Sequence, residues 1–121
     1  MRFRSFVWVI VAVNALFALE TFVLPKVDDA LKKQGKEIYD RDCYACHRWT
    51  RPFAGPAMSE NIEKYRERPE ALVAYLKNPT PQNPSKYPPM TIDPLTESEA
   101  KVLSAWLFFL MNNTSDPDRP K

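Results

Sequence analysis

The chain has 121 residues, which is enough for one domain and not for two. Its formal net charge of +2 excludes the broad basic face that nucleic-acid-binding proteins carry, so we expect no nucleic-acid partner. With 12 prolines and only 2 glycines, its loops are expected to be stiff.

An apolar segment opens the chain. The first five residues (MRFRS) carry two arginines, and residues 6–19 (FVWVIVAVNALFAL) are almost wholly apolar, which is typical of an export signal. If no cleavage occurs, residues 6–25 provide the roughly 20 residues that a membrane-spanning helix needs. Residues 1–25 are therefore expected to be either a cleaved signal peptide or an uncleaved transmembrane anchor. Arg2 and Arg4 favour an orientation that places the rest of the chain outside the cytoplasm.

A first helix is predicted after Pro25, running into residues 43–47. Either Asp28 or Asp29 can cap its amino terminus. Its apolar face follows a spacing of three and four residues and consists of Leu31, Gly35, Ile38 and Tyr39.

Two short helices should follow an irregular segment. The first is expected over residues 60–67, capped by Ser59, and the charged run 59–70 is interpreted as an exposed helix face. The second is expected over residues 69–77, because Pro69 suits the first position of a helix.

Six prolines then occupy residues 78–94 and exclude both a helix and a central strand there. A last helix is expected to begin after Thr96, which forms a capping-box pattern with Glu99. Its apolar positions are Leu103, Trp106, Leu107 and Leu110. Because no segment alternates with a period of two, we predict an all-α domain over residues 26–112, with a loose polar tail at 113–121.

Residues 43–47 (CYACH) hold both cysteines and the only histidine. A structural zinc site needs four ligands, and the chain has only these three candidates. Dithiol exchange favours a CxxC that follows a strand, and no strand is predicted. The spacing is instead typical of covalent haem attachment. Cys43 and Cys46 can each bond one vinyl group, and His47 can bind the iron, so one haem c is expected.

The second iron ligand cannot be another histidine. The remaining candidates for this position are a methionine, an unusual lysine or tyrosine ligand, or no protein ligand at all. Met1 is remote, Met58 is close to the proximal side, and Met111 suits core packing. Met90 lies in a proline-rich loop with no evident core role, so His47 and Met90 are the predicted metal ligands. Such a pair raises the reduction potential.

These residues make the segment 30–111 resemble a class I monohaem cytochrome c. In that family a glycine and an aromatic residue precede the first haem cysteine by eight and four residues, as Gly35 and Tyr39 do here. The resemblance implies that Gly35 allows the first helix to cross the last at close range, with Trp106 at the crossing.

The resemblance extends to a Gly-Pro pair after the CxxCH, matched by Gly55 and Pro56. It implies that the Pro56 carbonyl accepts a hydrogen bond from His47, which fixes the imidazole. Further family positions are matched by Leu72, Leu76, Pro79, Leu95 and Leu103. The chain departs from the family where Pro89-Met90-Thr91 replaces the usual Met-Pro, so the ligand loop is expected to take its own path.

The resemblance implies a small cytochrome c fold of about four helices around one haem, and a one-electron carrier rather than an enzyme. The alternative is a five-coordinate haem protein that binds a ligand or catalyses a reaction. The expected location is the periplasmic side of the bacterial inner membrane, anchored or soluble. The expected partners are redox proteins, including a membrane respiratory complex, and no small-molecule substrate is expected.

Two further groups of residues bear on partners. Phe108 and Phe109 either pack within the domain or form an apolar patch for a partner or the membrane surface. Arg48, Arg51 and Lys86 either dock an acidic partner or are simply solvated.

Overall fold

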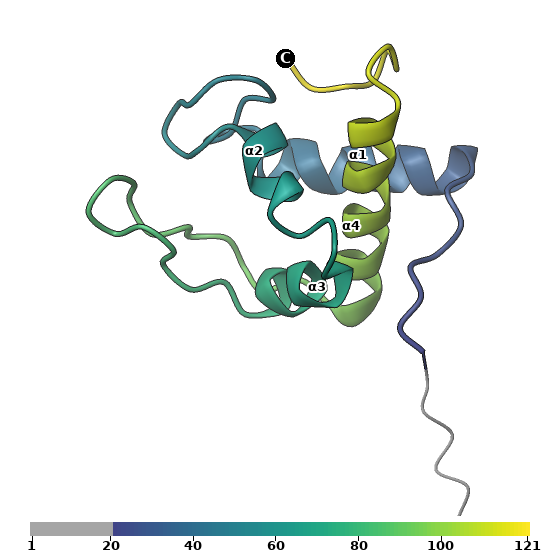
Figure 1. Cartoon of the computed structure of the whole chain (residues 1–121), viewed down its shortest axis with the longest axis horizontal. Helices are drawn as coiled ribbons and strands as arrows, with labels where there is room; N and C mark the ends of the chain where they lie inside the picture. The colour runs from purple at the N-terminus through teal and green to yellow at the C-terminus, as the bar shows by residue number, and fades with distance from the viewer. Residues whose placement is uncertain (1–20) are drawn as a thin grey trace, which may run out of the picture.

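The computed structural model describes residues 21–121 and contains four helices there: α1 (Asp29–Asp42), α2 (Met58–Glu63), α3 (Pro69–Lys77) and α4 (Glu97–Asn112) (Figure 1). This part of the chain has no strand, which confirms the all-α prediction. None of its helices is long and apolar enough to cross a membrane. Most of the predicted signal or anchor at residues 1–25 lies outside the described residues.

The core is organised by the crossing of α1 and α4 (Figure 1). A Cβ atom built on Gly35 would lie 2.6 Å from Cβ of Trp106, so the two backbones approach more closely than any side chain would permit. Tyr39 meets Trp106 edge to face, with ring centroids 5.8 Å apart, and both side chains are fully buried. The predicted apolar faces of both helices are therefore confirmed.

Two predicted caps are also confirmed. The Asp28 carboxylate accepts a hydrogen bond from Leu31 N at 2.8 Å and opens α1. At α4 the Thr96 hydroxyl accepts from Glu99 N at 3.2 Å, while the Glu99 carboxylate accepts from Thr96 N at 3.1 Å. This reciprocal pair satisfies backbone donors that the helix itself cannot.

Helix α2 differs from its prediction. It begins at Met58, so Ser59 lies inside the helix and the predicted Ser59 cap is wrong. A side-chain cap is unnecessary because two backbone carbonyls accept from the first donors of the helix. Met58 N donates to Arg48 O at 2.9 Å, and Ser59 N donates to Trp49 O at 3.0 Å.

The tail also departs from expectation, because it folds back onto the domain. Asp116 pairs with Lys32 at 3.3 Å, and the Arg119 guanidinium lies 5.1 Å from the ring centroid of Trp49. Trp49 N donates to Lys121 O at 3.4 Å. Trp49 is only 1% exposed, so the segment that covers it is part of the folded unit and not a loose end.

Phe108 and Phe109 are half-buried against the hydrophobic core. The Lys32 ammonium lies 4.5 Å from the ring centroid of Phe109 and covers it. Of the two roles considered for these residues, packing within the domain agrees with their burial.

Candidate functional site

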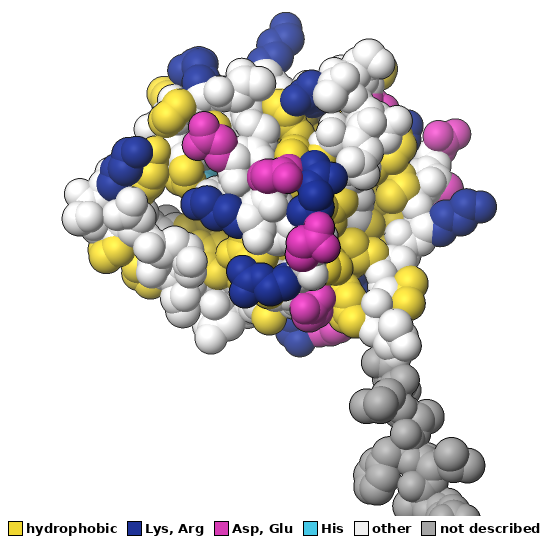
Figure 2. All heavy atoms as spheres, in the orientation of Figure 1, with side chains coloured by type: hydrophobic (Ala, Val, Ile, Leu, Met, Phe, Trp, Pro, Cys, Tyr) yellow, Lys and Arg dark blue, Asp and Glu magenta, His cyan; other side chains and the backbone are white. Residues whose placement is uncertain are grey.

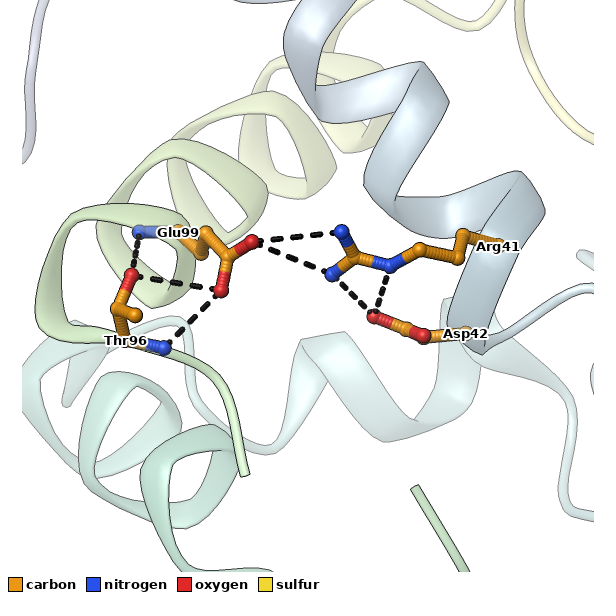
Figure 3. A network of polar contacts seen from close by, with 4 residues as sticks. All are labelled: Arg41, Asp42, Thr96 and Glu99. Atoms are coloured by element: carbon orange, nitrogen blue, oxygen red, sulfur yellow. Dashed lines mark hydrogen bonds and ion pairs between the residues drawn. The ribbon is translucent and has the colours of Figure 1, made fainter. Parts of the chain in front are cut away.

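The site begins where α1 ends. Arg41 binds the Asp42 carboxylate through Nη2 at 2.7 Å and reaches across to Glu99 of α4 at 3.3 Å, while Glu99 is held by Thr96 (Figure 3). The Arg41 side chain is exposed and the two carboxylates are only partly buried, so we expect each ion pair to add little stability. Their main effect is to fix positions, because they join the end of α1, directly before Cys43, to the start of α4.

The motif CYACH continues α1 as one further turn. Cys43 N donates to Tyr39 O at 2.8 Å, Cys46 N donates to Cys43 O at 3.2 Å, and His47 N donates to Cys43 O at 3.0 Å. One turn of chain therefore presents two thiols and an imidazole together. Cys43 is buried and Cys46 is exposed.

The burial of Cys43 bears on its chemistry. Desolvation raises the pKa of its thiol to about 12. Cysteines that exchange disulfides lie in partly exposed, electropositive surroundings, so the burial of Cys43 disfavours dithiol exchange. In residues 21–121, moreover, no cluster of three or more His, Cys, Asp or Glu side chains could hold a metal ion.

His47 is clamped from two sides. Its Nδ1 lies 2.8 Å from the carbonyl oxygen of Pro56, and because a carbonyl only accepts, Nδ1 is the protonated nitrogen. The lone pair on Nε2 is thus available for a metal. Gly55 lies under the ring, where a Cβ atom would be 2.7 Å from Cε1 of His47. The loop itself is held by the bond from Gly55 N to Cys46 O at 2.8 Å.

Two cavities adjoin this imidazole. The larger, of about 360 Å³, lies between the proline-rich loop and the core, and a hollow with hydrophobic walls is visible there on the left of Figure 2. The smaller, of about 330 Å³, is lined by the end of α1, Cys46 and residues 89–93. Among residues 21–121, only His47 and Met90 line both cavities.

The wall of the larger cavity suits a flat apolar macrocycle. Its apolar residues come from three helices and include Met58, Ile62, Leu72, Leu76, Leu103 and Leu107. Leu72 and Leu76 line the cavity from α3, and Leu103 and Leu107 line it from α4. The residues present therefore fit a haem group attached beside His47.

Sequence reasoning missed part of this wall. Ile62 is 2% exposed and Tyr65 is half-buried, so the charged run 59–70 is not simply an exposed face. The rings of Tyr65 and Tyr75 stack at 6.5 Å and both line the cavity. Burial raises the pKa of each phenol. The three-residue spacing of Ile62 and Tyr65, which is typical of one helix face, could have indicated this from the sequence.

Two thiols on one turn, an imidazole with a free Nε2 and an adjoining apolar cavity define a protein that binds haem covalently. Comparison with known proteins identifies the family. The cytochrome c family model matches residues 32–108. Cytochrome c-551 of Stutzerimonas stutzeri is 32% identical over 85 residues, which cover 67% of this chain and 81% of that protein.

A solved structure agrees with this assignment. Cytochrome c from Rhodothermus marinus superposes with a TM-score of 0.63 at 27% identity, over 78% of this chain and 90% of that one. The chain therefore belongs to the cytochrome c family, and it is a class I c-type cytochrome. It transfers electrons through one covalently attached haem c, and Cys43 and Cys46 fit the attachment motif.

The methionines are distributed as follows. Met90 lies at the cavities that His47 also lines, and Met58 lines the larger one from the core side. Met111 is half-buried against the core, and Met1 lies outside the described residues. Iron ligation by Met90 stays a prediction.

Proposed function

We propose that the protein is a one-electron carrier in a respiratory or photosynthetic chain, with its haem iron bound by His47 and Met90. The supporting observation is that, of the residues the structure describes, these two alone line both cavities. If a haem occupied these cavities, side chains that line both of them would be well placed to hold its iron. When bound, the haem supplies a one-electron change of iron valence.

Met58 is the competing thioether, and its surroundings are less suitable. It is 7% exposed, packs in the core cluster, and lines the larger cavity only. Its backbone is fixed by the hydrogen bond to Arg48 O at 2.9 Å. Met90 is half-buried and carried by a loop whose prolines restrict its path.

The proposed ligation explains why a carrier is favoured. If His47 and Met90 both held the iron, no open position would remain for oxygen or peroxide. The clamp on His47 by Gly55 and Pro56 also holds the imidazole in one orientation in both oxidation states. Little rearrangement should therefore accompany the transfer of an electron.

The oxidised absorption spectrum of the haem-loaded protein tests the ligation. We expect a sulfur-to-ferric-iron charge-transfer band, and no rapid carbon monoxide binding after reduction. Met90→Ala should remove the band and admit carbon monoxide, whereas the matched control Met58→Leu should keep the unaltered spectrum. A high-spin spectrum of the unsubstituted protein would instead support the five-coordinate alternative, and loss of the band in Met58→Leu would move the ligand to that residue.

We further propose that the carrier works on the periplasmic side of the membrane and that residues 6–25 tether it there. The apolar length of that segment supports the proposal. So does the way it joins the domain: Phe22 and Leu24, at the end of that segment, and Val27, just beyond it, are half-buried against the core. Lys101 of α4 lies 5.8 Å from the ring centroid of Phe22. A tether would therefore join the domain without a long flexible linker, as suits a subunit of a membrane complex.

A further inference from the structure

Two exposed aromatic side chains lie beside the haem-attachment turn. Among the described residues only three large hydrophobic side chains are exposed, and two of them are Tyr44 at 43% and Phe53 at 52%. Arg48 and Arg51 lie close to them in the chain. We call Tyr44, Arg48, Arg51 and Phe53 the aromatic–arginine patch.

The patch is organised around Arg48. Its guanidinium carbon lies 4.4 Å from the ring centroid of Tyr44 and 4.3 Å from that of Phe53, so it contacts both rings. Its Nη1 donates to Tyr44 O at 2.6 Å and to His47 O at 3.0 Å. Arg51 adds a second guanidinium 6.0 Å from the Phe53 ring. Because these contacts already order the side chains, binding a partner through them costs little further entropy.

The charge of this patch is not neutralised by its neighbours. Residues 43–59 contain Arg48 and Arg51 but no aspartate or glutamate. Within residues 21–121 neither arginine forms an ion pair, whereas Arg41 and Arg66 each hold a carboxylate at 2.7 Å. Two positive charges therefore stand uncompensated beside two exposed rings.

The patch is also close to the redox centre. Tyr44 and Arg48 flank Cys46, which is exposed and fits the haem-attachment motif. Arg48 is bonded to the backbone of His47, and Phe53 N donates to Gly55 O at 2.9 Å, so the same loop positions the ring and supports the imidazole. A protein seated here would lie next to one edge of the haem.

We propose that the aromatic–arginine patch is the docking surface for a redox protein that presents carboxylates around an apolar centre. Tyrosine and arginine are the residues that most often dominate binding energy at interfaces. Complementary charge raises the rate of encounter. One electron passes between the haem iron and the partner's redox centre, and no bond or proton is exchanged. The inference rests on the proposed carrier function.

The first test locates the surface. The reduced holoprotein is mixed with hexacyanochromate(III), a redox-inert paramagnetic trianion, and line broadening is mapped by NMR. We expect broadening of amide signals between residues 44 and 53, and its loss in Arg51→Glu. Broadening centred on Lys64 and Lys86, at the wall of the larger cavity, would overturn the proposal.

The second test addresses the class of partner. Reduction of the oxidised holoprotein by a plant-type [2Fe–2S] ferredoxin, a small acidic redox protein, is followed by stopped flow. Arg51→Glu should lower the second-order rate several-fold at low salt, with the difference shrinking as salt rises, because exposed charges are screened. Phe53→Ser should lower the rate at all salt concentrations.

Lys86→Glu is the matched control, because it reverses an exposed charge at the cavity wall instead of in the patch. The proposal fails if Lys86→Glu slows the reaction as much as Arg51→Glu does, or if neither patch variant slows it. Each variant's absorption spectrum, recorded first, reports folding and ligation. Failure of the Met90 ligation would appear in that spectrum, whereas failure of the docking proposal would appear only in the map and the rates.

Discussion

The two glycines of this chain lie where there is no room for a side chain. No described residue has a positive φ, so neither Gly35 nor Gly55 serves a left-handed turn. Each lies instead where a side chain would collide with a ring: Gly35 with Trp106 and Gly55 with His47. One glycine sets the helix crossing and the other supports the predicted iron ligand.

Gly55→Ala should disturb the imidazole. The new methyl group would lie 2.7 Å from Cε1 of His47, so the ring must shift away and weaken its 2.8 Å bond to Pro56 O. We expect an altered haem spectrum and a stability loss of about 1–3 kcal/mol, the usual cost of overpacking. Absorption spectra and thermal unfolding of the holoprotein measure both effects. Ala54→Ser, at the exposed neighbouring position, is the control; equal behaviour of the two variants would contradict the clamp.

At the scale of helices, the crossing of α1 and α4 positions the site. Cys43 follows directly from α1, and Leu103 and Leu107 of α4 form part of the cavity wall. Any shift between these helices would therefore move the attachment turn relative to the wall. The close approach at Gly35 and the network of Arg41, Asp42 and Glu99 oppose such a shift at two separate points (Figure 3).

Gly35→Ala should separate the two helices. Its methyl group would lie 2.6 Å from Cβ of Trp106, an atom close to the backbone that cannot easily give way. We expect a loss of about 1–3 kcal/mol in the free energy of unfolding, measured with denaturant. Gln34→Ala, one residue away on the exposed face of α1, should change stability by less than about 0.5 kcal/mol. If Gly35→Ala left the free energy of unfolding unchanged, the close crossing would be disproved.

The α4 cap should make stability depend on pH. The hydrogen bond from Thr96 N and the neighbouring Arg41 guanidinium stabilise the charged Glu99 and lower its pKa below the ordinary value of 4.5. Its contribution is therefore complete above about pH 4.5 and is lost as pH falls through the lower pKa of the folded state. Thr96→Ala should cost about 1 kcal/mol at neutral pH.

Urea unfolding at pH 7 and pH 3 tests this expectation. The stability difference between the unsubstituted protein and Glu99→Gln should be present at pH 7 and smaller at pH 3. Glu67→Gln changes an exposed glutamate that forms no ion pair in the described residues, and it should show no such trend. A difference that grew in acid would reverse the assigned sign.

At the scale of the whole molecule, both ends of the described chain close over the core. The amino-terminal side brings Phe22 and Leu24 against it, and the carboxyl-terminal side brings Arg119 and Lys121 to Trp49. The larger cavity is lined by residues of both the proline-rich loop and the α1–α2 connection, and the aromatic–arginine patch belongs to that connection. Figure 1 shows where these two segments lie relative to the helices.

Cell fractionation tests whether residues 1–25 hold the protein at a membrane. We expect the full chain to sediment with membranes, to resist washing with high salt, and to be released by mild detergent, because an apolar segment of about 20 residues spans the bilayer. A form that starts at Thr21 keeps Phe22, Leu24 and the Asp28 cap, and it should appear in the soluble periplasmic fraction when exported with a cleavable signal. Small residues such as Ala15 and Ala18 suit the cleavage site of a signal peptide. Recovery of the full-length gene product as a soluble protein cut after either of them would establish a signal peptide instead.

Local patterns accounted for much of the fold. The apolar spacing of α1 and α4, the Asp28 cap and the Thr96–Glu99 box depend on residues three or four positions apart, and these predictions are confirmed. The start of α2 was predicted wrongly because its first donors bind carbonyls of Arg48 and Trp49, which no helix rule anticipates.

The sequence by itself determined the type of cofactor and predicted its two attachment points and proximal ligand. All three depend on the spacing of Cys43, Cys46 and His47 within one turn, so short-range geometry is sufficient to specify them. Only the tertiary structure decided which methionine shares both cavities with His47, which tyrosines line the larger one, and where the tail packs. These outcomes depend on contacts between segments far apart in the chain, whose geometry is set by the α1–α4 crossing and not by any local pattern.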